Sequence, residues 1–240
     1  MIKKYVILLV IIAAILFVSP MAFAVEFGPN SAKITNRYYP AKVGGWTYML
    51  GAAGSNWAGR FIYANVVGIE EVSGAQIDAQ TFNNVKCLKV NMIMAKQNDE
   101  DDFLTIWMAQ DTEGNVWFLK IYIFPDNLTI LLGTFFKSMF MPAVPDVGDP
   151  AGIILEEDTD TYCQIVEAGI TINTNFGSYD NCIKSQCLYN SSIESVEYYC
   201  LDVGEVRTTE DSSPNPQDVI DLKEYGAATV KKAVVIPLMD

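Results

Sequence analysis

The residues of this sequence best suited to hold a cation stand in AQDTEGNVWFLK (residues 109–120), where Asp111, Glu113 and Asn115 surround Gly114. Calcium prefers carboxylate and amide oxygens, and a helix–loop–helix calcium loop ends in a bidentate glutamate. Here apolar residues stand where that glutamate is needed. Glycine supplies the positive φ of a tight hairpin, and aspartate and asparagine favour turns. The stretch therefore predicts a turn between two strands.

Two further acidic runs, NDEDD (residues 98–102) and EEDTD (residues 156–160), also offer oxygen ligands. The weak candidates for metal ligation in them are Asp99, Asp101, Asp102, Glu156, Asp158 and Asp160. Charge runs between strands are typical of solvated loops. We therefore expect neither a metal site nor a cofactor, and a calcium-stabilised structural module stays an alternative.

Histidine is absent, which removes the most common general base and metal ligand. Serine or cysteine triads that need histidine are therefore excluded, and no phosphate loop or dinucleotide fingerprint occurs. Paired carboxylates could still hydrolyse a glycosidic bond, and Glu70, Glu71, Asp111 and Glu113 are the candidates. We expect a non-enzymatic protein, with a carboxylate-dependent glycan hydrolase as the alternative.

The first 24 residues have the pattern of a secretory signal peptide. Lys3 and Lys4 precede an apolar run (residues 5–18), and Ala22 and Ala24 stand at the offsets of a cleavage site. The run is short for a membrane span, although an uncleaved anchor stays an alternative. We expect a secreted or periplasmic protein, cut near Ala24, with no stable membrane span after cleavage.

The rest of the chain is strongly acidic. Without Lys3 and Lys4 it has 14 basic and 29 acidic residues, a formal charge of −15. A nucleic-acid partner would need a basic surface, so we expect none. The five cysteines are Cys87, Cys163, Cys182, Cys187 and Cys200. In an oxidising compartment some should pair and one is left over, and any bridge should staple the second half.

Strand-like runs rich in β-branched and aromatic residues fill the chain, and they appear in two similar series. CLK at Cys87 recurs as CIK at Cys182, and Gly114 matches Gly204 in the hairpin that follows. We predict a mainly β fold of two related antiparallel units, which pack together or share one curved sheet, with few short helices. The units are residues 25–141, including an apolar connector, and residues 142–240.

Three segments of the chain resemble motifs of other proteins and occur in the same order as in those proteins. RYYPAKVGGWTYML (residues 37–50) resembles a Tyr-Phe-Pro…Gly…Trp-x-Tyr motif of many bacterial secreted proteins and lipoproteins. SYDNCIK (residues 178–184) resembles their Cys-Leu-Lys strand, and EYYCLDVGEVR (residues 197–207) resembles their Tyr-Tyr…Gly-Val-Gly hairpin, apart from Cys200 and Arg207. No reaction is assigned to these proteins, so the resemblance implies no catalytic residue.

Apolar side chains supply the candidate ligand site. The connector (residues 127–141) carries one charge and has apolar residues at helical spacing, and Trp57 stands in a loop-like stretch. The connector either packs into the core or forms an exposed patch. The candidate ligand-binding residues are Trp57, Leu131, Phe135, Phe136, Met139 and Phe140. We expect an extracytoplasmic binding or structural protein for an apolar ligand, an envelope component or a protein partner.

Overall fold

The computed structural model describes residues 25–77, 80–95, 102–124, 126, 128–131, 139–152, 162–189, 192–209 and 219–227. Within these residues every regular element is a strand. The strands are β1 (Gly45–Gly51), β2 (Phe61–Val72), β3 (Ala75–Ile77), β4 (Gln80–Phe82), β5 (Val85–Ala95), β6 (Asp102–Gln110), β7 (Val116–Phe124), β8 (Leu128–Leu131), β9 (Met139–Met141), β10 (Tyr162–Asn173), β11 (Ser178–Tyr189), β12 (Ser192–Cys200), β13 (Gly204–Thr209) and β14 (Val219–Ala227). The prediction of a mainly β fold is confirmed.

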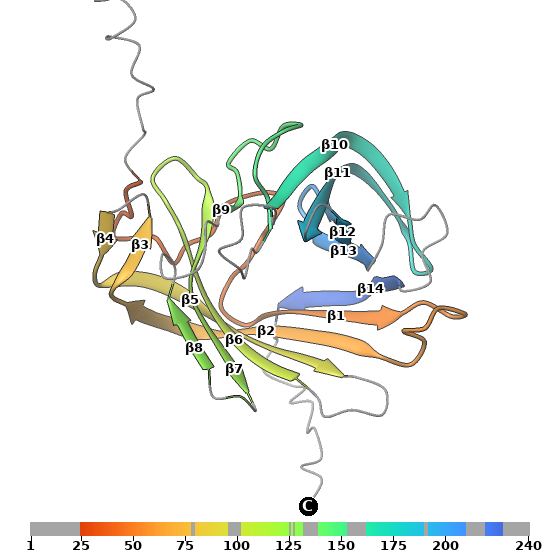
Figure 1. Cartoon of the computed structure of the whole chain (residues 1–240), viewed down its shortest axis with the longest axis horizontal. Helices are drawn as coiled ribbons and strands as arrows, with labels where there is room; N and C mark the ends of the chain where they lie inside the picture. The colour runs from red at the N-terminus through yellow and green to blue at the C-terminus, as the bar shows by residue number, and fades with distance from the viewer. Residues whose placement is uncertain are drawn as a thin grey trace, which may run out of the picture.

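One large antiparallel sheet holds twelve of these strands, in the order β10-β11-β12-β13-β14-β1-β2-β5-β6-β7-β8, with β9 paired to β7. The hairpin of β3 and β4 forms a separate small sheet. Figure 1 shows the large sheet curving from β10 and β11 through β14 and β1 to β7 and β8. The last strand, β14, pairs with the first, β1, in the middle of the sheet. The expected curved sheet is present.

The two halves contain the same kind of meander: β2, β5, β6 and β7 are successive neighbours, as are β10, β11, β12 and β13. The glycine matched between the halves follows the third strand of each meander. Gly114 has a φ of 102° and Gly204 a φ of 95°, a conformation that glycine adopts at low cost. These positions agree with the predicted hairpins, and the internal duplication itself stays a prediction.

The turn between β6 and β7 is built on the side chain of Asp111. Its Oδ1 accepts hydrogen bonds from the backbone amides of Glu113, Gly114 and Asn115, at 2.8–3.0 Å. Its Oδ2 accepts from the indole Nε1 of Trp117, at 2.8 Å, and from the Asn115 side chain. The turn prediction is confirmed, and both carboxylate oxygens are engaged by the protein itself.

We expect Asp111→Ala to lower the free energy of unfolding by about 2 kcal/mol, because it leaves buried donors without an acceptor. Glu113→Ala is the matched control, since Glu113 is exposed in the same turn, and it should change little. Urea denaturation of both variants measures the difference. Equal stability of the two variants would contradict this role of Asp111.

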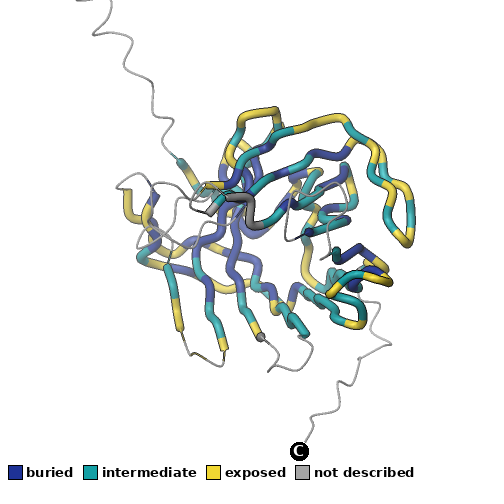
Figure 2. The backbone as a smooth tube through the Cα atoms, turned by 45° about the vertical axis from the view of Figure 1, so that its right-hand side comes forward, coloured by how far each residue is buried: buried dark blue, intermediate teal, exposed yellow. Residues whose placement is uncertain are grey.

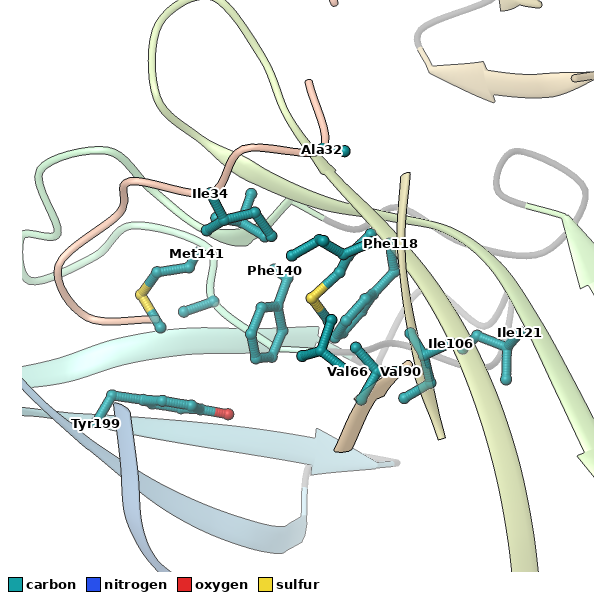
Figure 3. Close-up of a cluster of buried hydrophobic side chains, with 14 of the residues drawn as sticks. Ala32, Ile34, Val66, Val90, Ile106, Phe118, Ile121, Phe140, Met141 and Tyr199 are labelled. Carbon is teal, nitrogen blue, oxygen red and sulfur yellow. The ribbon is translucent and has the colours of Figure 1, made fainter. Parts of the chain in front are cut away.

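The curved sheet has two arms, one formed by β2, β5, β6 and β7 and the other by β10, β11, β12 and β13. The main core lies between these two arms. It takes Leu88, Met108 and Phe118 from one arm and Ile165, Ile183 and Tyr199 from the other. Phe140 of β9 sits between the arms, with its ring 4.3 Å from that of Phe118 and 5.7 Å from that of Tyr199 (Figure 3). Figure 2 shows the buried stretches gathered where the arms face each other and the exposed ones at the hairpin ends.

Two smaller clusters complete the core. One lies under the small sheet and includes Phe82, Trp107, Trp117 and Leu119. The other gathers Met49, Val206, Ile220, Leu222 and the bridged Cys182 and Cys200. Disulfides join Cys163 to Cys187 and Cys182 to Cys200, while Cys87 is a buried free thiol. The prediction that disulfides form within the second half of the chain is confirmed.

Residues 34–42, which we call the strap, cross between the arms. Two backbone amides of the strap donate to the side-chain oxygen of Gln110, including that of Asn36 at 3.0 Å. The Asn36 side chain donates to the carbonyls of Gly114 and Pro142, at 3.3 and 2.7 Å. This end of the strap is therefore fixed to the β6–β7 turn.

The next residue of the strap, Arg37, is fixed to the β12–β13 turn. Arg37 forms a bidentate ion pair with Asp202, and the Asp202 amide donates to the Arg37 carbonyl. The strap thus connects the two glycine turns that the sequence comparison matched, one from each half.

The apolar connector differs from its helical expectation. Leu128–Leu131 is strand β8 and Met139–Met141 is strand β9, both hydrogen-bonded to β7. Edge pairing with β7 outweighs the helical spacing, because it satisfies backbone groups that a short isolated helix would satisfy poorly. Phe140 and Met141 are core residues, whereas Leu128 is 48% exposed. Phe135 and Phe136 lie outside the described residues.

Candidate ligand-binding site

The sheet opens between β13 and β14. Their pairing covers only Arg207, Thr208 and Thr209 against Asp221, Ile220 and Val219. Beyond this point β14 continues along β1 as far as Ala227, while β13 runs back to Gly204. The two strands therefore part, and the residues on either side of the opening line a cavity of about 360 Å³.

The cavity has mostly apolar walls. The inward-facing residues of the central strands form its floor, and the strap covers it. The apolar lining residues are Ile34, Tyr39, Pro40, Ala41, Trp46, Met49, Ile62, Ala64, Val66, Val90, Met92, Val203 and Tyr225. Ligand pockets of proteins typically have volumes of about 300–1,000 Å³ and mainly apolar walls with a few polar groups. This cavity has that size and composition.

The polar lining comes mainly from the β12–β13 turn and the strap: Lys42, Asp202 and Glu205. Lys42 and Asp202 are exposed, and Asp202 is paired with Arg37. That arginine and its hydrogen bond hold the pKa of Asp202 below its usual value. Glu205 differs from both, because it is half-buried and its carboxyl group accepts no hydrogen bond from any described residue.

Glu205 has a second acid beside it. Glu205 pairs with Tyr199 across β12 and β13, and Glu197 stands two residues before Tyr199, on the same face of β12. The Tyr199 hydroxyl donates to Glu197 Oε2 at 2.6 Å. We call Glu197 and Glu205 the acid pair.

Burial sets the electrostatics of the acid pair. It raises the pKa of Glu205 well above its usual value, and the neighbouring charge of Glu197 raises it further. Burial also raises the pKa of Glu197, an effect that the hydrogen bond from Tyr199 opposes. Because both pKa values are raised, the folded acid pair keeps its protons to a higher pH than the unfolded chain, whose glutamates release theirs near pH 4.5. The contribution of the pair to the stability of the fold therefore falls as the pH rises.

The tyrosines around the pair are affected in the same direction. Burial raises the pKa of Tyr199 and of Tyr39, with the acid pair adding to both shifts. Both phenols are therefore neutral at physiological pH and can act as hydrogen-bond donors. The site as a whole combines an apolar wall with one half-buried acidic end.

The described residues of the sequence-based ligand site lie elsewhere. Trp57 packs beside the cluster of Met49 and Leu222 and stacks under the Arg60 guanidinium, 4.7 Å away. Leu131 and Met139 pack on the cluster under the small sheet, and Phe140 is in the main core. These residues are absent from the cavity lining. Ligand binding by them stays a prediction.

The acids proposed for glycan hydrolysis also lie outside the cavity, and two of them accept hydrogen bonds from neighbouring residues. Glu70 accepts from Lys89, at 2.7 Å, and from the Trp107 indole, at 2.9 Å. The hydrogen bond from Lys89 is the main cause that lowers the pKa of Glu70. Glu71 and Glu113 are exposed, and Asp111 is the turn residue described above. None of the four lines the cavity.

The acidic candidates for metal ligation fall largely outside the described residues. This holds for Asp99, Asp101, Glu156, Asp158 and Asp160, while only the backbone of Asp102 is described, at the start of β6. In the described part of the chain, no three cysteine or acidic residues gather closely enough to hold a metal ion. No helix among the described residues is long and apolar enough to cross a membrane.

The sequence did contain a signal for the acid pair, although reasoning from the sequence missed it. Glu197 and Glu205 lie on either side of the glycine turn, next to residues that are buried in the core. This series of buried residues comprises Val196, Tyr199, Cys200 and Val206. An acidic residue inside such a series is informative, because carboxylates are seldom buried without a partner.

Comparison with known proteins gives limited similarity. No protein-family model and no curated protein matches the sequence. A solved structure from Bacteroides fragilis, described as an exported protein with a YmcC-like fold, is 12% identical, covers 78% of this chain and 98% of its own, and has a TM-score of 0.42. A structure described as a lipoprotein, from Parabacteroides distasonis, is 11% identical, covers 80% and 99%, and has a TM-score of 0.35. At these scores the likeness supports no argument about fold or function.

Proposed function

We propose that this chain is an extracytoplasmic, non-enzymatic binding protein that holds a small apolar or amphiphilic molecule in the cavity between β13 and β14. The observation that carries this proposal is the cavity of about 360 Å³, lined on one side by the curved sheet and on the other by the strap. The pattern of residues 1–24 supports the location.

Two features favour binding over a purely structural role. The walls are apolar, so an apolar molecule gains free energy when it displaces water from them. The sheet also opens at this place although both strands continue, and this leaves the backbone edges of β13 and β14 beside the cavity. A protein optimised for stability alone would pair these edges.

The first test is a native mass spectrum of the chain after periplasmic expression. We expect bound mass that disappears on denaturation. If the spectrum shows only the bare chain, titration with N-phenyl-1-naphthylamine, a neutral apolar fluorophore, decides whether the cavity accepts a ligand. A bare mass together with no saturable fluorescence would contradict the proposal.

A pair of variants on β2 tests where the fluorophore binds. Ala64 lines the cavity, so Ala64→Phe should fill part of it and weaken binding by about tenfold or more. Val67 does not line the cavity and is 43% exposed, so Val67→Phe should leave binding unchanged. Melting curves of both variants show that the fold is retained. Equal loss of binding in the two variants would place the fluorophore elsewhere.

A further inference from the structure

We propose that the ligand of this cavity carries a basic nitrogen, whose ammonium group is bound by the Glu205 carboxylate while the apolar walls hold the rest of the molecule. This inference rests on the proposed function and specifies its ligand class. It starts from the position of Glu205, which lines the cavity, is half-buried and has no hydrogen-bond donor among the described residues.

Other acids in the described part of the chain show what Glu205 lacks. Asp221 is fully buried, and Arg207 Nε donates to it at 2.6 Å. Glu70 has Lys89 and the Trp107 indole, and Glu167 has Lys184 at 3.0 Å. A ligand that fills the cavity displaces water from the Glu205 carboxylate, which is costly, and an ammonium group on that ligand would offset this cost as a charged hydrogen-bond donor.

The groups that face the acid pair do not supply that cation. From β12 they are Tyr199 and Glu197 itself, and from the strap Tyr39. At the cavity wall Asp202 is already paired with Arg37, and β14 contributes the phenol of Tyr225. Lys42 also lines the cavity, but it is exposed and forms no ion pair with Glu205. The field at Glu205 is therefore negative, as is the chain as a whole, with a formal charge of −13.

Charge and shape together discriminate between ligand classes. An anionic amphiphile would be repelled by the acid pair, and a neutral one would leave Glu205 desolvated without a partner. A calcium ion takes six to eight oxygen ligands, whereas the cavity walls are mainly apolar. A single ammonium group on an apolar body satisfies both the acid and the walls.

Proton linkage gives this interaction a characteristic pH dependence. An ammonium group favours the ionised carboxylate, so amine affinity should rise with pH as the acid pair loses its protons. It should fall again only when the amine itself deprotonates, near about pH 10. Binding of a neutral molecule of the same shape should not follow this curve.

Three probes with one rigid apolar body test the inference: 1-aminoadamantane, 1-adamantanol and adamantane-1-carboxylate, titrated calorimetrically at about pH 7.5. We expect the amine to bind at least about tenfold more tightly than the alcohol, and the carboxylate to bind most weakly. Glu205→Gln keeps the shape and removes the charge. It should bring the affinity for the amine down to that for the alcohol and leave the alcohol unchanged.

Glu197→Gln serves as the second variant, and melting curves check the fold of both. It should keep the preference for the amine and move the rise in amine affinity to lower pH, because Glu205 then ionises without a neighbouring acid. Equal affinity of the wild-type chain for amine and alcohol, or a preference that survives Glu205→Gln, would overturn the inference and leave the cavity's function intact. Absence of binding by all three probes would also overturn the inference, and it would overturn the proposed function only together with a bare mass and no saturable fluorescence of N-phenyl-1-naphthylamine.

Discussion

Replacing Arg207 with methionine is expected to lower the free energy of unfolding by about 3 kcal/mol. Arg207 and Asp221 face each other across β13 and β14, and Arg207 donates to both Asp221 oxygens, at 2.6 and 3.2 Å. Asp221 has no exposed side-chain surface, and its second oxygen also accepts from the Asn175 amide. Methionine keeps the length of the side chain but leaves a buried carboxylate with one remaining donor.

The effect should be large because of where the pair stands. The pairing of β13 with β14 is only three residues long, and it is the link between the second meander and the rest of the sheet. The same aspartate also binds the turn between β10 and β11 through Asn175. Loss of Arg207 therefore weakens both the short pairing and the contact between β14 and that turn.

Arg37→Met is the matched control, since it removes the same side chain from the other bidentate pair. Arg37 and Asp202 are 62% and 58% exposed, so water replaces the lost partner and stability should change little. Urea denaturation of both variants measures the difference. Similar midpoints for the two variants would show that burial of Asp221 does not decide the outcome.

Local patterns in the sequence were enough to predict many of the strands and two of the turns. Runs rich in β-branched and aromatic residues predicted β5, β6 and β7, and Gly114 and Gly204 marked turns that the structure contains. These features depend on neighbouring residues, which the sequence shows directly. The bridges within the second half followed from compartment and count, although the pairing required the register of β10, β11 and β12.

The cavity could not be predicted in this way, because its walls are far apart in the sequence. Ala64 and Val90 come from the first half and Glu205 from the second, and the strap closes over them. The pairing of β14 with β1, together with the strap, brings these segments together. The connector shows the same limit: its helical spacing was a local signal, and pairing with β7 decided the structure.

Loss of the Cys182–Cys200 bridge is expected to lower the free energy of unfolding by about 3 kcal/mol, from the constraint on a loop with a sequence separation of 18 residues. The Cys182→Ala/Cys200→Ala double variant tests this by urea denaturation. Cys87→Ala is the control, because Cys87 is buried but unbridged and burial raises the pKa of its thiol to about 12. The control should lose much less stability and leave the effect of reductant on the chain unchanged.

The bridge also has a consequence for the cavity. Cys200 pairs with Gly204 across β12 and β13, directly before Glu205, and Cys182 fixes Cys200 to β11. An unbridged turn can move Glu205 relative to the apolar walls, so the double variant should lose part of its preference for 1-aminoadamantane over 1-adamantanol. If the preference persists at full strength in a folded double variant, the bridge stabilises the second half without positioning Glu205. If stability also matches that of Cys87→Ala, the bridge contributes to neither property.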